Sequence, residues 1–221
     1  MKKKSSYSVI NTHKSMLVQT LQFFGVEWVK TPTFLSRLLR GYFNLKPSVP
    51  RCIKSWDVSL VLKLLKSWMP LKDLSLKFLT FKLITLVALT TASRAQTLLA
   101  LDIRHMSIFT DRIVFQVNTL LKTSRPGVPL PKVYLYKYQN PELCVVLTLI
   151  EYLKMTSSRR KSSSLFVSHK TFLRVSTSTL ARWLKTVLNL SGIDDSRFKA
   201  HSFRSTAASV AFDAGGGVRS G

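Results

Sequence analysis

The segment from Phe78 to Ala92 constrains this chain more than any other part of its sequence. It is predominantly apolar, with Lys82 as its one charged residue, and Lys77 and Arg94 bracket it. A helix that is apolar on every side has to be buried on every side. The run is also shorter than the roughly 20 apolar residues of a membrane-spanning helix. The sequence therefore predicts one central helix buried inside a mostly helical domain.

A large excess of positive charge accompanies this apolar patterning. The 221 residues include 34 Lys and Arg against 10 Asp and Glu, a net charge of +24. Residues 1–55 carry +9, residues 56–156 carry +7 and residues 157–221 carry +8, so the excess is not a tail. A hydrophobic content of 46% allows a core and excludes disorder over the whole chain. Nucleic acid is the first partner to consider, and an anionic membrane surface the second.

Several other classes of protein are excluded by the residues that are scarce. Two cysteines, Cys52 and Cys144, cannot make a disulfide framework or a metal cluster, and Cys144 is predicted to be a buried thiol. The four histidines have no zinc-ligand spacing with these cysteines, and no Gly-rich phosphate loop is present. We therefore expect no metal and no cofactor. No signal peptide follows the basic start, so an intracellular location is expected.

Helical periodicity is interrupted once by a pattern typical of strands. Residues 112–121 and 132–138 are rich in β-branched and aromatic residues, and the segment KTSRPG (122–127) between them reads as a turn. The predicted fold class is mainly α with a small antiparallel β-sheet. Residues 157–164 (SSRRKSSS) are predicted to be a flexible basic loop. Helices are predicted over residues 8–45, from residue 56 to Pro70, from residue 75 to about 91, from Asn140, over Leu180–Leu188 and from His201.

Four residues could together bind a phosphodiester. Arg94 follows the buried helix, Lys122 lies at the tip of the predicted hairpin, and His201 and Arg204 share one helix face at i, i+3. The planar guanidinium of Arg matches two phosphate oxygens, and a hairpin Lys could donate a proton to a leaving oxygen. Each residue also has an ordinary alternative. Arg94 could be a surface arginine, Lys122 a solvated turn residue and His201 a helix cap.

The surrounding sequence favours the functional interpretation. The stretches LTTASRAQTLLALDIRHM, LLKTSRPG, TLARWLKTVLNLSGI and AHSFRSTAAS together resemble the catalytic domain of tyrosine recombinases of the phage-integrase type. The stretches INTHKSML, LLRGYFNLKPSVPR and SWDVSLVLKLL resemble recombinases of eukaryotic DIRS-type mobile elements. Residues 1–50 would be part of a helical DNA-clamping region, 51–55 the end of a linker, and 56–221 a catalytic-domain-like region.

The resemblance implies DNA integration or recombination by phosphodiester transesterification. Arg94 and Arg204 would hold nonbridging oxygens of the scissile phosphate, Lys122 would be the general acid for the 5′ leaving oxygen, and His201 would assist proton transfer. Where many members have an acidic residue soon after the first arginine, this chain has Gln96. Double-stranded DNA is the implied partner, and a eukaryotic member would be nuclear. Further DNA-binding residues are predicted at Arg125, Arg159, Arg160, Lys161 and Arg182.

The nucleophile of the family has no counterpart in this sequence. In the family a second His or Trp and then the nucleophilic Tyr follow the His-x-x-Arg motif, whereas here the sequence ends 17 residues after Arg204. All six tyrosines precede His201. We therefore expect a chain truncated before the nucleophile, unable to cleave DNA alone, and without the segment that members exchange to form stable tetramers.

Two other functions stand beside a recombinase fragment. One alternative is a non-catalytic DNA-binding protein that keeps the recombinase fold and the basic surface. An RNA-associated or membrane-surface protein is disfavoured, because we find neither an RNA-binding aromatic signature nor a long basic amphipathic helix.

Overall fold

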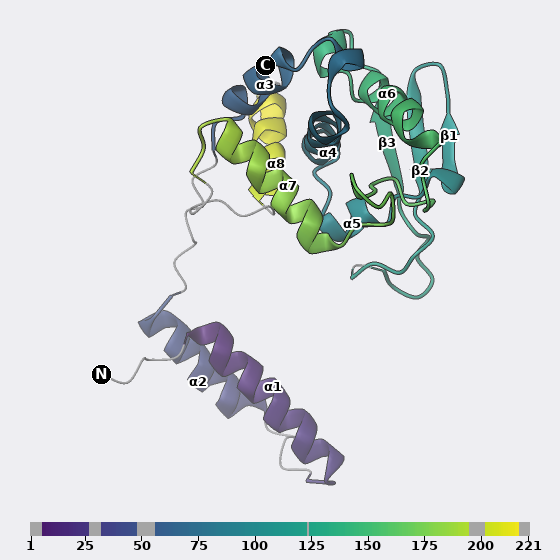
Figure 1. Ribbon diagram of the computed structural model, residues 1–221. Helices are drawn as coiled ribbons and strands as arrows, with labels where there is room; N and C mark the ends of the chain where they lie inside the picture. The colour runs from purple at the N-terminus through teal and green to yellow at the C-terminus, as the bar shows by residue number, and fades with distance from the viewer. Residues whose placement is uncertain (1–5, 27–31, 48–55, 123, 195–201, 217–221) are drawn as a thin grey trace. The chain divides into compact units, whose positions relative to one another are not determined.

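The computed structural model describes residues 6–26, 32–47, 56–122, 124–194 and 202–216, and side chains up to residue 210 (Figure 1). It divides into two compact units, Met1–Lys54 and Ser55–Gly221. The first unit holds α1 (Tyr7–Phe23) and α2 (Pro32–Leu45), so the helical stretch predicted over residues 8–45 is two helices. The Ser6 hydroxyl caps α1 by accepting a hydrogen bond from the Val9 N–H at 3.4 Å.

The second unit is mainly helical with one small antiparallel sheet, which confirms the predicted fold class. Its strands pair in the order β1-β2-β3. The elements are α3 (Val58–Ser67), η2 (Leu71–Asp73), α4 (Leu76–Thr91), α5 (Ala95–Leu99), η3 (Ile103–His105), β1 (Met106–Ile108), β2 (Arg112–Gln116), β3 (Lys132–Tyr136), η4 (Pro141–Leu143), α6 (Val145–Ser157), α7 (Thr177–Leu190) and α8 (Ser202–Gly216).

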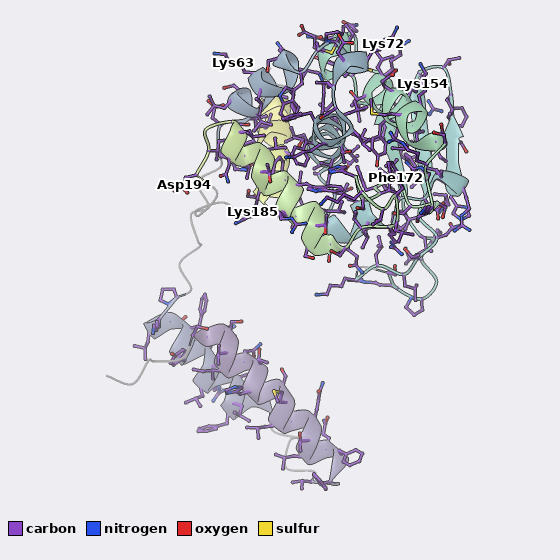
Figure 2. The ribbon with its side chains drawn as sticks, viewed as in Figure 1. Lys63, Lys72, Lys154, Phe172, Lys185 and Asp194 are labelled. Carbon is purple, nitrogen blue, oxygen red and sulfur yellow. The ribbon has the colours of Figure 1, made fainter. Side chains whose placement is uncertain are left out.

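Helix α4 is the centre of the second unit, as the apolar segment predicted. Every residue from Leu79 to Ala88 is buried, and α6, α7 and α8 pack against it. Side chains fill the space around this helix in Figure 2. Ser75 starts the helix by accepting a hydrogen bond from the Phe78 N–H. Among the described residues, no helix is both long and apolar enough to cross a membrane.

The sheet buries one face and exposes the other. Ile113 and Phe115 of β2 point into the core together with Val133 and Leu135 of β3. The alternate residues of β3 are exposed, as strand geometry requires. The buried face joins the same hydrophobic cluster as α4 and α6, so the core is continuous across helices and sheet.

Lys82 is a fully buried cation in the middle of α4. Its ammonium group donates hydrogen bonds to the carbonyl oxygens of Leu65 at 2.8 Å and Trp68 at 2.7 Å. These carbonyls lie at the end of α3, where helical hydrogen bonding runs out, although the Leu65 carbonyl also accepts a hydrogen bond from the Trp68 N–H at 3.3 Å. Burial lowers the pKa of Lys82 to about 8, although the charge of Glu142 acts in the opposite direction. Lys82 therefore joins α3 to the central helix.

The buried Lys82 should make the stability of the second unit depend on pH. The pKa of Lys82 is about 8 in the folded protein, whereas its ordinary value, which applies to the unfolded chain, is 10.5. Between pH 8 and pH 10.5 the unfolded chain therefore binds more protons than the folded protein. Stability should therefore rise with pH across this window. Between about pH 7.5 and pH 10, the unfolding free energy of the native protein should rise by about 1–3 kcal/mol more than that of Lys82→Met. Urea titrations at the two pH values measure this difference. The exposed Lys63→Met on α3 is the control and should show no such shift. Parallel pH profiles for native protein and Lys82→Met would contradict the assignment.

Candidate nucleic-acid interface

Arg94 lies at a sharp turn that follows the buried helix. Helix α4 ends at Thr91, whose hydroxyl donates a hydrogen bond to the Val87 carbonyl at 2.7 Å. Ala92 then adopts a left-handed conformation with φ 46°, which redirects the chain. Arg94 occupies the N-cap position of α5 without a side-chain hydrogen bond. Arg94 is exposed.

Lys122 lies beside the helix that Arg94 begins. The loop between β2 and β3 spans residues 117–131 and is longer than a tight hairpin turn. The Lys122 N–H donates a hydrogen bond to the Gln96 side-chain oxygen at 3.4 Å. Gln96 is in the first turn of α5, two residues after Arg94. Gln96 therefore joins the backbone of Lys122 to α5, the helix that Arg94 begins, a contact that the sequence did not reveal.

The start of α8, which carries Arg204, is held in place by Trp56. The indole N–H of Trp56 donates a hydrogen bond to the Ser202 hydroxyl at 2.9 Å, and its ring packs edge-on against Phe203 at 4.9 Å. All three of these side chains are buried. Arg204 follows directly and is exposed. His201 lies outside the described residues, so its role stays a prediction.

A cationic groove lies at the start of α7. Its volume is about 340 Å³, and it brings the predicted Arg182 together with Lys170 and Arg174, which sequence reasoning did not single out. A tight turn at Phe172 (φ 57°) folds the preceding segment back, with the Ser168 N–H bonded to the Leu173 carbonyl. The remaining lining residues are Ser168, His169, Val175, Ser176, Thr179 and Trp183.

His169 contributes little positive charge to this groove. Its ring stacks on Trp183 at 4.8 Å with an angle of 13° between the planes. Burial lowers the pKa of His169, and the nearby charge of Lys77 lowers it further. The groove's charge therefore comes from its Lys and Arg residues.

Arg160 has a structural role that differs from the predicted DNA contact. Its guanidinium donates hydrogen bonds to the carbonyls of Ser164 and Leu165 and, at 2.8 Å, to the Thr156 hydroxyl. It also lies over the Tyr152 ring at 5.7 Å. Because the guanidinium is half-buried and already bonded, it has little capacity left for a phosphate. Arg159, Lys161 and Arg125 are exposed, as DNA contacts would require.

The segment 157–164 was predicted to be a flexible loop, but hydrogen bonds at Ser163 hold its C-terminal end in place. The Ser163 hydroxyl donates to Asp102 at 2.8 Å, and the Ile103 N–H donates to the Ser163 carbonyl at 2.8 Å. Burial would raise the pKa of Asp102, but hydrogen bonds from Arg104 and Ser163 outweigh it and lower the pKa to about 2. Tertiary hydrogen bonds thus order a sequence whose composition is typical of a loop.

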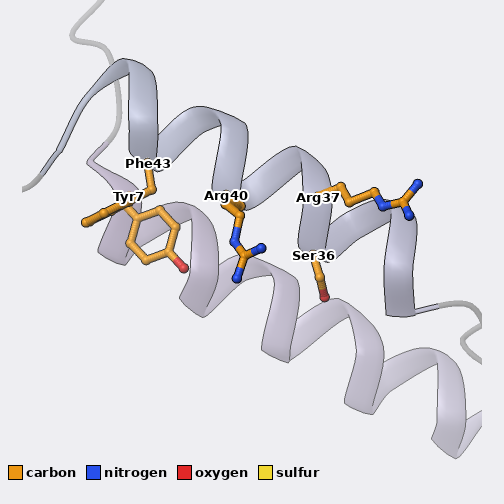
Figure 3. Close-up of a pocket in the computed structure, with 5 residues that line it drawn as sticks. All are labelled: Tyr7, Ser36, Arg37, Arg40 and Phe43. Atoms are coloured by element: carbon orange, nitrogen blue, oxygen red, sulfur yellow. The ribbon is translucent and has the colours of Figure 1, made fainter.

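The first unit presents two further arginines. A pocket between α1 and α2 is lined by Arg37 and Arg40 together with Tyr7, Ser36 and Phe43. Figure 3 shows Arg40 reaching toward α1, whereas Arg37 points away along α2. The rings of Tyr7 and Phe43 meet edge-on at 5.3 Å and hold the two helices together.

Solved structures of recombinases share this fold. The XerH site-specific recombinase in a post-cleavage complex with palindromic difH substrate matches with a TM-score of 0.52 and 16% identity, over 71% of this chain and 40% of the XerH chain. Its pre-cleavage complex with difH matches at 0.51 and 16%, over 71% and 41%. The XerA recombinase matches at 0.50 and 18%, over 95% of this chain and 79% of XerA.

These matches establish the fold as that of tyrosine recombinases, and this chain spans about 40% of the XerH length. Comparison of the sequence with protein-family models and with curated proteins gave no match.

The Trp56–Ser202 hydrogen bond should matter for stability. Ser202→Ala leaves a buried indole N–H without an acceptor, which should cost about 1–3 kcal/mol of unfolding free energy in urea titrations. Ser209→Ala on the same helix is the matched control, because Ser209 is exposed, and it should cost less than about 0.5 kcal/mol. Equal destabilisation by the two variants would mean that the Trp56 hydrogen bond does not hold the start of α8.

Proposed function

We propose that this chain is a tyrosine-recombinase-like protein that binds double-stranded DNA and supplies the phosphate-binding groups of a strand-transfer site. The observation that carries the proposal is the Gln96 contact, which links Lys122 to the helix begun by Arg94 within a tyrosine-recombinase fold. XerH was solved bound to a DNA substrate, which supports DNA as the partner.

The proposed chemistry is stabilisation of charge on a phosphate. In transesterification a tyrosine oxygen bonds to phosphorus while the bond to the 5′ oxygen breaks, and negative charge collects on the nonbridging oxygens. Arg94 and Arg204 would neutralise that charge through fixed N–H donors. Lys122 would give its proton to the departing 5′ oxygen, and His201 would assist proton transfer. No metal or nucleotide is required in this scheme.

A wider set of cations would hold the DNA backbone around this phosphate. Arg125, Arg159, Lys161 and Arg182 stay in the proposed set, Lys170 and Arg174 join it through their groove, and Arg160 leaves it because of its internal hydrogen bonds. The first unit, with Arg37 and Arg40, would be part of the DNA clamp. Contacts of this kind carry affinity without reading sequence.

A mobile element of eukaryotic DIRS type is the proposed source of the chain. The support is the resemblance of the stretches from Ile10 to Arg51 and from Ser55 to Leu65 to recombinases of such elements. DNA integration in a eukaryote would place the protein in the nucleus.

Binding without cleavage is the activity that we propose for these 221 residues alone. Tyr152 is fully buried and its hydroxyl accepts a hydrogen bond from the Val167 N–H, while Tyr134 and Tyr136 lie on the sheet. Tyr7 and Tyr42 belong to the first unit. No tyrosine follows His201, where the family's nucleophile lies. A non-catalytic DNA-binding protein with the recombinase fold is the second candidate.

Substitution of the two arginines should separate them from bystander cations. Arg94→Ala with Arg204→Ala should weaken binding to nicked duplex DNA roughly tenfold or more. It should also reduce the slope of log affinity against log salt by about 0.9 for each phosphate that the variant no longer neutralises. Lys63→Ala with Lys72→Ala is the charge-matched control, since these lysines lie at the opposite end of the second unit from α5 (Figure 2). Equal weakening by both pairs, in fluorescence anisotropy, would demote the arginines to general surface charge.

Covalent trapping tests the nucleophile. Incubation of the 221-residue chain with nicked duplex DNA should yield no protein–DNA adduct that survives denaturing electrophoresis, because no tyrosine occupies the nucleophile's position. Binding to the same DNA, measured in parallel, guards against an inactive preparation. A covalent adduct mapped to any of the six tyrosines would contradict the proposal.

A further inference from the structure

The solvent-facing side of the sheet carries a row of aromatic rings. Tyr134 and Tyr136 alternate with the buried residues of β3 and are 45% and 59% exposed. Their rings are parallel within 14°, with centroids 6.3 Å apart. In the strand register Tyr134 lies opposite Val114 and Tyr136 opposite Arg112, so these residues share the outer face. Two parallel exposed rings on one open face offer a flat surface on which a ligand with aromatic rings could stack.

Positive charge surrounds these rings. A groove of about 280 Å³ on the same face is lined by Tyr134, Lys132, Arg112, Phe109 and His105, among others. The Arg112 guanidinium lies over the Phe109 ring at 5.0 Å, which gives a second flat, cationic surface. Two Lys or Arg side chains line this groove, Lys132, which is exposed, and Arg112, whose guanidinium also pairs with Asp111 at 2.9 Å. The face therefore suits an anion that also carries aromatic rings.

Single-stranded nucleic acid combines these two properties. A duplex hides its bases in its own stack and can offer only phosphates to a flat surface, so exposed tyrosines would add nothing to duplex binding. An unpaired strand exposes both base faces and a phosphate backbone, and base–aromatic stacking favours binding of any sequence. A partner protein with an apolar surface would instead require the cations at the rim to be neutralised.

We propose that the outer face of the β1-β2-β3 sheet is a binding site for single-stranded DNA, in which bases stack on Tyr134 and Tyr136 while Arg112 and Lys132 contact the phosphates. The choice of DNA rather than RNA rests on the proposed function of the chain. The site itself goes beyond that function, because it shares no residue with the proposed phosphate site of Arg94, Lys122 and Arg204.

Paired substitutions at the two tyrosines test the site. Anisotropy of a labelled oligo(dT) of about 12 nucleotides reports single-strand affinity. Tyr134→Thr with Tyr136→Thr keeps β-propensity but removes the rings, and should weaken this affinity by about tenfold or more. Tyr134→Phe with Tyr136→Phe keeps the rings and should stay within about twofold. Thermal unfolding of each variant verifies its fold, and ultraviolet cross-linking of bromouracil-substituted oligonucleotide to the native chain should label residues 132–136.

Binding of the same variants to nicked duplex DNA distinguishes failure of this proposal from failure of the function proposed above. The Thr pair should leave binding to nicked duplex unchanged, whereas Arg94→Ala with Arg204→Ala should weaken duplex binding and spare oligo(dT). The sheet site would be overturned if Tyr134→Thr with Tyr136→Thr left the affinity for oligo(dT) unchanged. Cross-links confined to the groove at α7 would also overturn it. Tighter binding of oligo(U) than of oligo(dT) would overturn the assignment to DNA.

Discussion

Burial of α4 is the constraint on which the rest of the structure depends. A helix that is apolar all round is stable only when other elements cover it, and α6, α7 and α8 pack against its sides. Its one buried charge, Lys82, is tolerated because the ammonium group donates hydrogen bonds to the carbonyls of Leu65 and Trp68 at the end of α3. Once these elements are fixed around α4, the turns that leave it and the helices that flank it carry the exposed cations.

The candidate site is assembled from few direct contacts between its own residues. Gln96 links the Lys122 loop to α5, and Trp56 fixes the start of α8 through Ser202 and Phe203. The cations themselves point to solvent. Such an arrangement suits a polyanionic ligand, since mutual repulsion of the cations is relieved only when phosphates lie among them. In the function that we propose, the excess charge of the chain is divided between a small fixed set of cations and a broad surface for the DNA backbone.

Periodicity predicted much of the fold, because it reports directly on which side chains must leave water. The central helix, the two main strands, the buried face of α7 and the buried Cys144 were all confirmed. Loop composition was a poorer guide. The serines and cations of the segment 157–164 are typical of a flexible loop. Arg160, however, is hydrogen-bonded to Thr156, Ser164 and Leu165, and Ser163 to the distant Asp102. The sequence pattern did not single out Lys170 and Arg174, because the turn at Phe172 is what brings them into one groove with Arg182.

The sequence by itself determined the class of fold, the partner chemistry implied by a charge of +24, and the order of Arg94, Lys122 and Arg204 along the chain. These follow from local patterns and from composition, which need no knowledge of contacts. Only the tertiary structure decided which cations are free for a ligand and which, like Arg160, are consumed inside the protein. It also decided that the tyrosines of β3 gather on one open face. The first depends on how residues 156–165 fold around the Arg160 guanidinium, and the second on the packing of the opposite face of the sheet into the core. Composition reports neither of these.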